Sequence, residues 1–214
     1  MDRAEHATRA GSWAGRVLGS AEEFLATWAL AAMVLLPLAE ILVRRVFAGG
    51  IPGSVPFVQH LTLWVGFLGA AIAARRGKLI ALATATFIPD GPARRRAQIF
   101  AATVAAAVST ILALGGVELV LLDKEAGTII AAGVPVWVAQ LVLPLSFGLI
   151  AARLVWRAAP GWAGRAVAGT GIIVGLGLGQ FFEVFEGVPA WPGLLVILTA
   201  AVLGAPIFTI LGGA

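Results

Sequence analysis

The sequence predicts an all-α membrane protein with about six transmembrane helices. Of its 214 residues, 60% are hydrophobic and only 12% are charged, too few charges to cover a soluble domain of this size. The apolar residues form continuous runs, whereas a transmembrane β-barrel shows alternating segments of about ten residues. Basic residues flank these runs, so the net charge of +4 reflects membrane topology, and we expect no nucleic-acid partner.

Chemical motifs are sparse. The chain contains no cysteine, which excludes disulfides, thiolate metal sites and cysteine nucleophiles. It has no HExxH, GxSxG or Walker motif and only two histidines, so it has none of the usual hydrolase or nucleotide-binding signatures. We therefore expect no enzyme activity, no catalytic residue, and no cofactor or metal held by this chain.

The first 23 residues are polar, and we expect residues 1–23 to be a cytoplasmic tail. They lack the features of a cleaved signal peptide, so the first span would act as an uncleaved anchor. Ser20 precedes Glu22 and Glu23, which predicts a helix N-cap followed by acids in the first turn. The first span is then expected over residues 24–43.

The second span is the most informative stretch. Residues 57–74 are free of formal charge, and 18 residues at about 1.5 Å each nearly match a hydrocarbon core of about 30 Å. Small residues at helical spacing predict close contact with other helices. Those singled out are Gly66, Gly69 and Ala70. Three basic residues follow and predict a cytoplasmic anchor. They are Arg75, Arg76 and Lys78.

The middle of the chain predicts two more spans. Residues 79–88 are too short to cross a bilayer, and we expect an amphipathic helix at the membrane interface. The alternative is a soluble extension of the second span. An arginine cluster at residues 94–96 then introduces a span over 97–122, and a fourth span is expected over 134–152.

Two further spans are expected near residues 166–182 and 191–211. The fifth carries a GxxxGxxxG pattern, which typically brings two helices into close contact. Its glycines are Gly171, Gly175 and Gly179. No strand precedes these glycines and the spacing is not GxGxxG, so a dinucleotide-binding loop is excluded.

Charge counts predict the orientation. With the N-terminus inside, 12 of the 15 Lys and Arg residues lie on the inner side. The three outside are Arg44, Arg45 and Lys124. This asymmetry predicts a cytoplasmic N-terminus.

Several polar residues near the outer side are candidate partner or interface contacts. Glu40 stands four residues before Arg44, the acid-first spacing of a helical ion pair. The interpretations are an interfacial ion pair or a role in transport. Glu118 would either reach the interface or pair with Arg44 or Arg45. The two arginines would otherwise contact lipid phosphates or a protein partner.

Gln59 and His60 lie one turn into the second span. Polar groups in a span usually bond to another helix or face the interior of the bundle. The alternatives are an interhelical hydrogen bond and a direct functional role.

An autonomous transporter usually needs several polar groups near the membrane midplane. The predicted spans carry almost no polar groups there, which favours a scaffold or accessory subunit.

The order of these motifs resembles a known family. An acid pair precedes the first span, RRVF closes it, and LTLWVGFLGAAIAARRGK is followed by a short piece ending in IPD and by an arginine cluster. Over residues 20–157 this resembles the small membrane subunit of tripartite ATP-independent periplasmic (TRAP) transporters. The chain departs from the family pattern at Gln59 and His60, close to positions where acidic residues are common.

The resemblance implies a division of the chain. Residues 24–157 would form the four-helix region of a small subunit, 158–187 a connector helix, and 188–214 the start of a region similar to the large subunit, which the LGAPIF phrase resembles. Some family members fuse the two subunits, and we expect this chain to be the front of such a fusion. The alternative is that the sixth span is simply the last helix.

The resemblance also implies a function. The chain would be the scaffold subunit of a Na⁺-coupled, binding-protein-dependent importer of organic acids in the bacterial inner membrane. Its partners would be the bilayer, a periplasmic substrate-binding protein and a large, elevator-type membrane subunit, in the same polypeptide or separate, that holds substrate and Na⁺. The outer arginines would help to dock the binding protein. The alternative is a structural or signalling membrane protein that acts by helix–helix assembly without transport.

Overall fold

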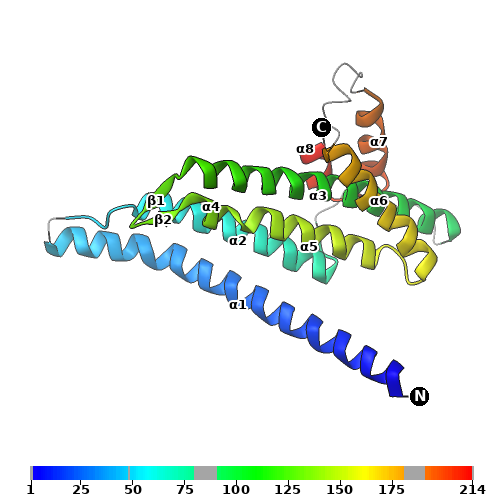
Figure 1. The fold of residues 1–214 in the computed structure, drawn as a ribbon, viewed down its shortest axis with the longest axis horizontal. Helices are drawn as coiled ribbons and strands as arrows, with labels where there is room; N and C mark the ends of the chain where they lie inside the picture. The colour runs from blue at the N-terminus through cyan, green and yellow to red at the C-terminus, as the bar shows by residue number, and fades with distance from the viewer. Residues whose placement is uncertain (1, 48, 80–90, 181–190, 214) are drawn as a thin grey trace.

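The protein is an elongated helical bundle in a computed structural model that describes residues 2–47, 49–79, 91–180 and 191–213. Helices α2, α3 and α5 lie side by side, and α1 runs along one side of them (Figure 1). Five helices of the described part are long and apolar enough to cross a membrane, and α7 is a shorter apolar helix. This confirms the predicted all-α membrane class. The helices are α1 (Asp2–Phe47), α2 (Ser54–Arg76), α3 (Pro92–Ala126), α4 (Val136–Gln140), α5 (Val142–Arg157), α6 (Trp162–Gln180), α7 (Trp191–Val202) and α8 (Ile207–Gly213).

Helix α1 is much longer than predicted. The N-cap expected at Ser20 is wrong, because the helix already begins at Asp2 and continues to Phe47. Its 46 residues would measure about 69 Å at 1.5 Å per residue, more than twice the hydrocarbon thickness. Glu22 and Glu23 therefore cap no helix end, and both pair with arginines of other helices.

Helix α2 ends where the basic residues begin. Gly77 has φ 67°, its N–H donates to the Ala74 carbonyl at 3.2 Å, and the Lys78 N–H donates to the Ala73 carbonyl at 2.9 Å. These two bonds form a Schellman motif, in which glycine takes the left-handed conformation at low cost. The interfacial helix predicted at 79–88 lies, from residue 80 on, outside the described residues.

The loop between α3 and α4 contains a small antiparallel hairpin, β1 (Ile129–Ala131) and β2 (Val134–Pro135). Its two turn residues, Ala132 and Gly133, both have positive φ, as a two-residue hairpin turn requires. The fourth span then runs over α4 and α5 with a break at Leu141. Proline at 144 explains the break, because it has no N–H to bond the carbonyl four residues earlier.

The sixth span is not one continuous helix. Helix α7 ends in a second Schellman motif, in which Gly204 has φ 97° and the Ala205 N–H donates to the Ala200 carbonyl at 2.8 Å. Pro206 follows, and proline commonly follows such helix ends. With 12 and 7 residues, α7 and α8 are each too short to cross a bilayer.

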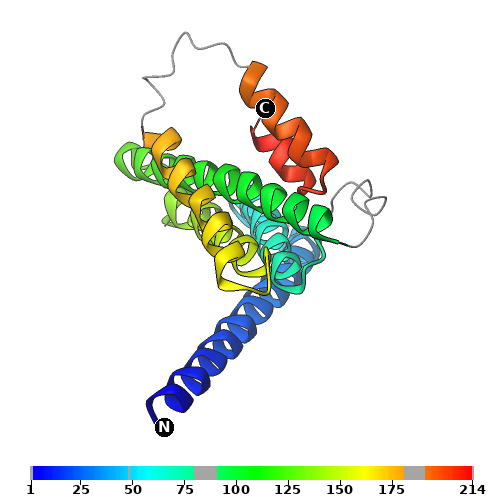
Figure 2. The same ribbon diagram turned by 90° about the vertical axis from the view of Figure 1, so that its right-hand side faces the viewer.

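Helix α3 is the centre of the bundle. It contacts α4, α5, α6, α7 and α8, and Figure 2 shows α6 and α7 on different sides of it. The glycines of α6 lie directly on α3. A Cβ added at Gly171 would lie 2.2 Å from the Thr103 carbonyl oxygen, and one at Gly175 would lie 2.5 Å from the Ala107 carbonyl oxygen. The two backbones are therefore in contact, as in other small-residue interfaces.

We expect Gly171→Leu to separate α6 from α3 and to lower the stability of the bundle by about 1–3 kcal/mol, since no side chain fits against the α3 backbone. Gly177→Leu is the matched control on the same helix, because a Cβ there meets nothing within 4 Å. Thermal unfolding in detergent, followed by circular dichroism, measures the difference. Equal unfolding temperatures for the two variants would contradict the assigned interface.

Candidate functional site

Polar side chains gather at the two ends of the bundle. We call the end that holds the C-termini of α2 and α5 and the N-terminus of α3 the basic end. We call the opposite end, with residues 49–53 and the β-hairpin, the loop end. The basic end carries most of the cations of the described part. They are Arg75, Arg76, Lys78, Arg94, Arg95, Arg96, Arg153, Arg157 and Arg165.

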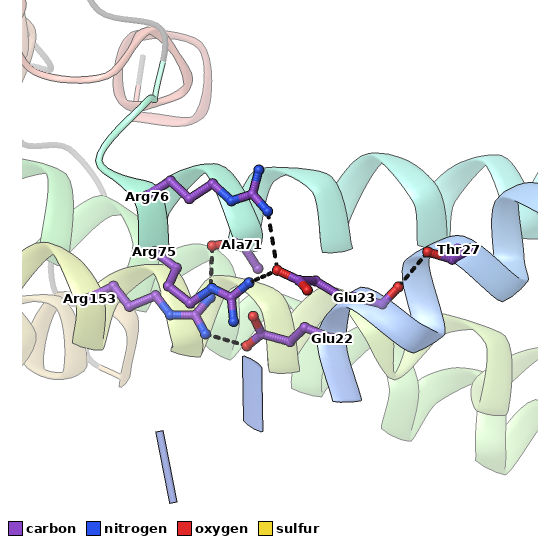
Figure 3. Close-up of polar contacts among 7 residues, drawn as sticks. All are labelled: Glu22, Glu23, Thr27, Ala71, Arg75, Arg76 and Arg153. Atoms are coloured by element: carbon purple, nitrogen blue, oxygen red, sulfur yellow. Dashed lines mark hydrogen bonds and ion pairs between the residues drawn. The ribbon is translucent and has the colours of Figure 1, made fainter. Parts of the chain in front are cut away.

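A buried ion pair joins α1 to α5 at the basic end. The Arg153 guanidinium bonds the Glu22 carboxylate through Nη2 and donates from Nη1 to the Ala71 carbonyl of α2 at 2.7 Å (Figure 3). Only 6% of the Glu22 side chain and 15% of the Arg153 side chain are exposed. One arginine thus connects three helices, and loss of either partner would leave a buried charge without compensation.

Glu23 makes a second, more exposed contact. Its carboxylate accepts from Arg75 and, at 3.2 Å, from Arg76 of α2. Half of the Glu23 side chain is exposed, so solvent screens this pair and its contribution to stability is smaller than that of the buried pair. We call Glu22, Glu23, Arg75, Arg76 and Arg153 the basic-end cluster; it fixes the position of α1 against α2 and α5 (Figure 3).

Two other arginines position the neighbouring helix ends. Arg157 Nη1 donates to the Arg75 carbonyl at 2.9 Å, which satisfies a carbonyl in the last turn of α2. Arg165 lies over the Trp156 ring, with 4.5 Å between Cζ and the ring centroid. Its Nε also donates to the Ala159 carbonyl at 3.0 Å, so it orders the turn between α5 and α6.

At the loop end, Glu40 connects α1 to the segment that follows it. Its carboxylate accepts from Arg44 Nη2 at 2.7 Å and from the backbone N–H of Ile51. Glu40 is 13% exposed and Arg44 is 71% exposed. The helical ion pair expected from the spacing is therefore present, and it also holds the loop. Arg45 is exposed.

Gln59 and His60 form no hydrogen bond to another helix among the described residues. His60 Nδ1 lies 2.8 Å from the Pro56 carbonyl oxygen of its own helix, and Gln59 is exposed. Two other side chains of this span donate to neighbouring helices: Trp64 Nε1 to the Ala139 carbonyl of α4 at 2.7 Å, and Thr62 Oγ1 to Met33 Sδ of α1 at 3.3 Å. A tryptophan within a span is a sequence signal for such an interhelical hydrogen bond, because its N–H needs an acceptor when it is buried.

Glu118 is exposed on α3. Among the described side chains it forms no ion pair with Arg44 or Arg45. Arg44 is paired with Glu40 instead.

The small residues of α2 divide between two faces. A Cβ at Gly66 or Gly69 would meet nothing within 4 Å, so these glycines contact no neighbouring helix in the described part of the chain. The buried face instead carries Ala71 and Ala74, which pack on Ile150 of α5 with Ala70 at the edge. The expected packing at Gly66 and Gly69 is thus not made among the described residues, because the helix is rotated toward its alanines.

The polar contacts of the described residues position the helices against one another. In the described ranges, no group of three His, Cys, Asp or Glu side chains could hold a metal ion. The charged side chains of the described residues lie toward the two ends of the bundle, where several of them bond other charges and backbone carbonyls.

Comparison with known proteins finds one family. The family model described as "Tripartite ATP-independent periplasmic transporters, DctQ component" matches residues 33–164, which is more than half of the chain. No curated relative and no solved structure matches. The match covers the C-terminal third of α1, all of α2 to α5 and the start of α6.

The ion pair between Glu22 and Arg153 generates a direct prediction. Glu22→Gln and Arg153→Gln should each destabilise the bundle by about 3–5 kcal/mol, because each leaves a buried charge without its partner. Thermal or denaturant unfolding of the purified chain measures the loss. Glu23→Gln is the matched control and should cost less, since Glu23 is half exposed.

The double variant carrying Glu22→Gln and Arg153→Gln separates this pairing from general disruption. It should lose less stability than the sum of the single variants, as expected for two coupled groups. Strict additivity would show that the two side chains do not stabilise each other.

Proposed function

Because this chain belongs to the DctQ component family of tripartite ATP-independent periplasmic transporters, we propose that it braces the large membrane subunit of such a transporter. The family match over residues 33–164 is the observation that carries this proposal. The protein would be a multi-pass protein of the bacterial inner membrane, with its N-terminus in the cytoplasm. The excess of cations at the basic end supports that orientation.

The sparse interior polarity supports bracing over transport by this chain alone. Two buried hydroxyls near the middle of α3, those of Ser109 and Thr110, donate to carbonyls of their own helix at 2.7 and 2.8 Å. Charged side chains of the described residues lie toward the two ends of the bundle. An ion or substrate path would normally need polar groups near the membrane midplane. The substrate, which we propose to be an organic acid, and a coupling Na⁺ would therefore bind in the large subunit.

Helix α1 offers the surface for the partner. Only 6% of its apolar window is buried, against 39% for α3, and within the bundle it packs mainly on α2. Its exposed side chains include Trp28, Leu35 and Ile41. We infer that these exposed side chains of α1 meet the large subunit or the surrounding lipid. Close approach of a helix would suit Gly66 and Gly69.

The domain division remains a proposal. The matched region ends at residue 164, near the start of α6, which is consistent with a small-subunit region followed by a connector helix. Helices α7 and α8 would then belong to a region similar to the large subunit.

The bracing role predicts a dependence of transport on this chain. We expect the large subunit, reconstituted with the periplasmic binding protein, to show severalfold lower Na⁺-driven uptake when residues 1–157 are absent, since its support in the bilayer is lost. Uptake into proteoliposomes measures this, with equal amounts of large subunit confirmed by immunoblot. Full uptake without residues 1–157 would rule out the scaffold role.

Docking of the binding protein at the loop end generates a further prediction. Arg45→Glu should weaken docking severalfold, because the reversed charge repels an acidic partner surface. This substitution leaves the contact between Glu40 and Arg44 intact. Uptake at limiting binding protein measures docking, with Arg96→Glu at the basic end as the control for net charge. If both variants transport equally, Arg45 takes no part in docking.

A further inference from the structure

A cavity at the basic end has a lining of two kinds. It has a volume of about 370 Å³ and lies between the C-terminal ends of α2 and α5, the first turns of α3 and the turn between α7 and α8. Its apolar wall includes Ala101, Ala102, Leu154 and Leu203, and its polar lining includes Gln98 and two arginines, Arg153 and Arg157. No acidic side chain is among the residues that line it.

The two arginines differ in whether a carboxylate neutralises their charge. The charge of Arg153 is balanced by Glu22. Arg157 bonds the Arg75 carbonyl and, among the described side chains, has no carboxylate partner. Its guanidinium lies close to Gly77, where an added Cβ would lie 2.4 Å from Nη2 and 2.8 Å from Cζ. The cavity therefore carries a positive charge at Arg157 that no carboxylate of the described residues neutralises.

The position and lining of the cavity indicate the class of ligand that it fits. It lies where the apolar windows of α2 and α5 end, which is the level of lipid headgroups. The guanidinium geometry matches phosphate oxygens, and basic pockets between membrane helices are typical sites for anionic headgroups. The alanine and leucine wall would receive the hydrocarbon next to the headgroup.

We propose that this cavity binds one anionic phospholipid of the leaflet at the basic end, with its phosphate at Arg157 and the start of an acyl chain against Ala102 and Leu203. The lipid would join α2 and α5 to the turn between α7 and α8. All the lining residues belong to this chain, so the site is testable on the chain alone.

Native mass spectrometry of the delipidated full chain, titrated with phosphatidylglycerol and with phosphatidylcholine, tests the site. We expect one tightly held phosphatidylglycerol per chain and weaker phosphatidylcholine, because only the former has a net negative charge. Arg157→Gln should lower phosphatidylglycerol affinity at least severalfold. Arg96→Gln, which makes the same charge change outside the cavity, should leave it unchanged. An equal loss in both variants would overturn the proposal, because binding would then follow net charge alone.

A second variant guards against misfolding. Ala102→Phe fills the apolar wall while it leaves both arginines in place, and it should also weaken phosphatidylglycerol binding; unchanged binding would overturn the assigned cavity. Glycerol phosphate and inorganic phosphate at the same concentration separate the sources of phosphate. Neither should displace the lipid. If either displaced it as well as phosphatidylglycerol does, the site would recognise free phosphate and the lipid assignment would be wrong.

Discussion

The ion pair between Glu22 and Arg153 is the interaction on which the arrangement of the bundle depends. Helix α1 packs mainly on α2, and this pair extends its contact to α5. Because Arg153 also donates to the Ala71 carbonyl, a single guanidinium fixes three helices at one level. Charges in a low-dielectric region are stable only when paired and hydrogen-bonded, so the pair specifies one register of α1 against its neighbours.

Small residues determine the rest of the packing. In lipid, helices gain little from hydrophobic burial, so close backbone contact has to hold them together. Helix α6 achieves this with Gly171 and Gly175 on the carbonyls of α3, while α2 uses Ala71 and Ala74 against Ile150. The result is a bundle whose charges lie toward its two ends, which suits a subunit that supports another protein within the bilayer.

Several features could be predicted from the sequence, because they depend on local signals. The spans follow from apolar run length, the basic end from its arginines, and the pair of Glu40 with Arg44 from helical spacing. Other features depend on tertiary contacts that no local pattern encodes. The acids that read as a helix start are instead partners of α2 and α5, and the rotation of α2 that exposes Gly66 depends on how α5 packs. Pro206, two residues after Gly204, is a sequence signal for the break there. The length of the stretch 191–211 favours a single span.

The central claim is that the bundle acts as a rigid support, and a distance between α1 and α5 tests it most directly. The chain has no cysteine, so spin labels can be placed on cysteines at the exposed positions Val34 and Leu145 without other changes. Pulsed electron paramagnetic resonance on the chain bound to its large subunit would measure that distance with and without Na⁺ and substrate. A rigid support predicts one narrow distance that is the same in every condition. A second distance, or a shift on addition of substrate, would show that the bundle moves during transport and would contradict the account.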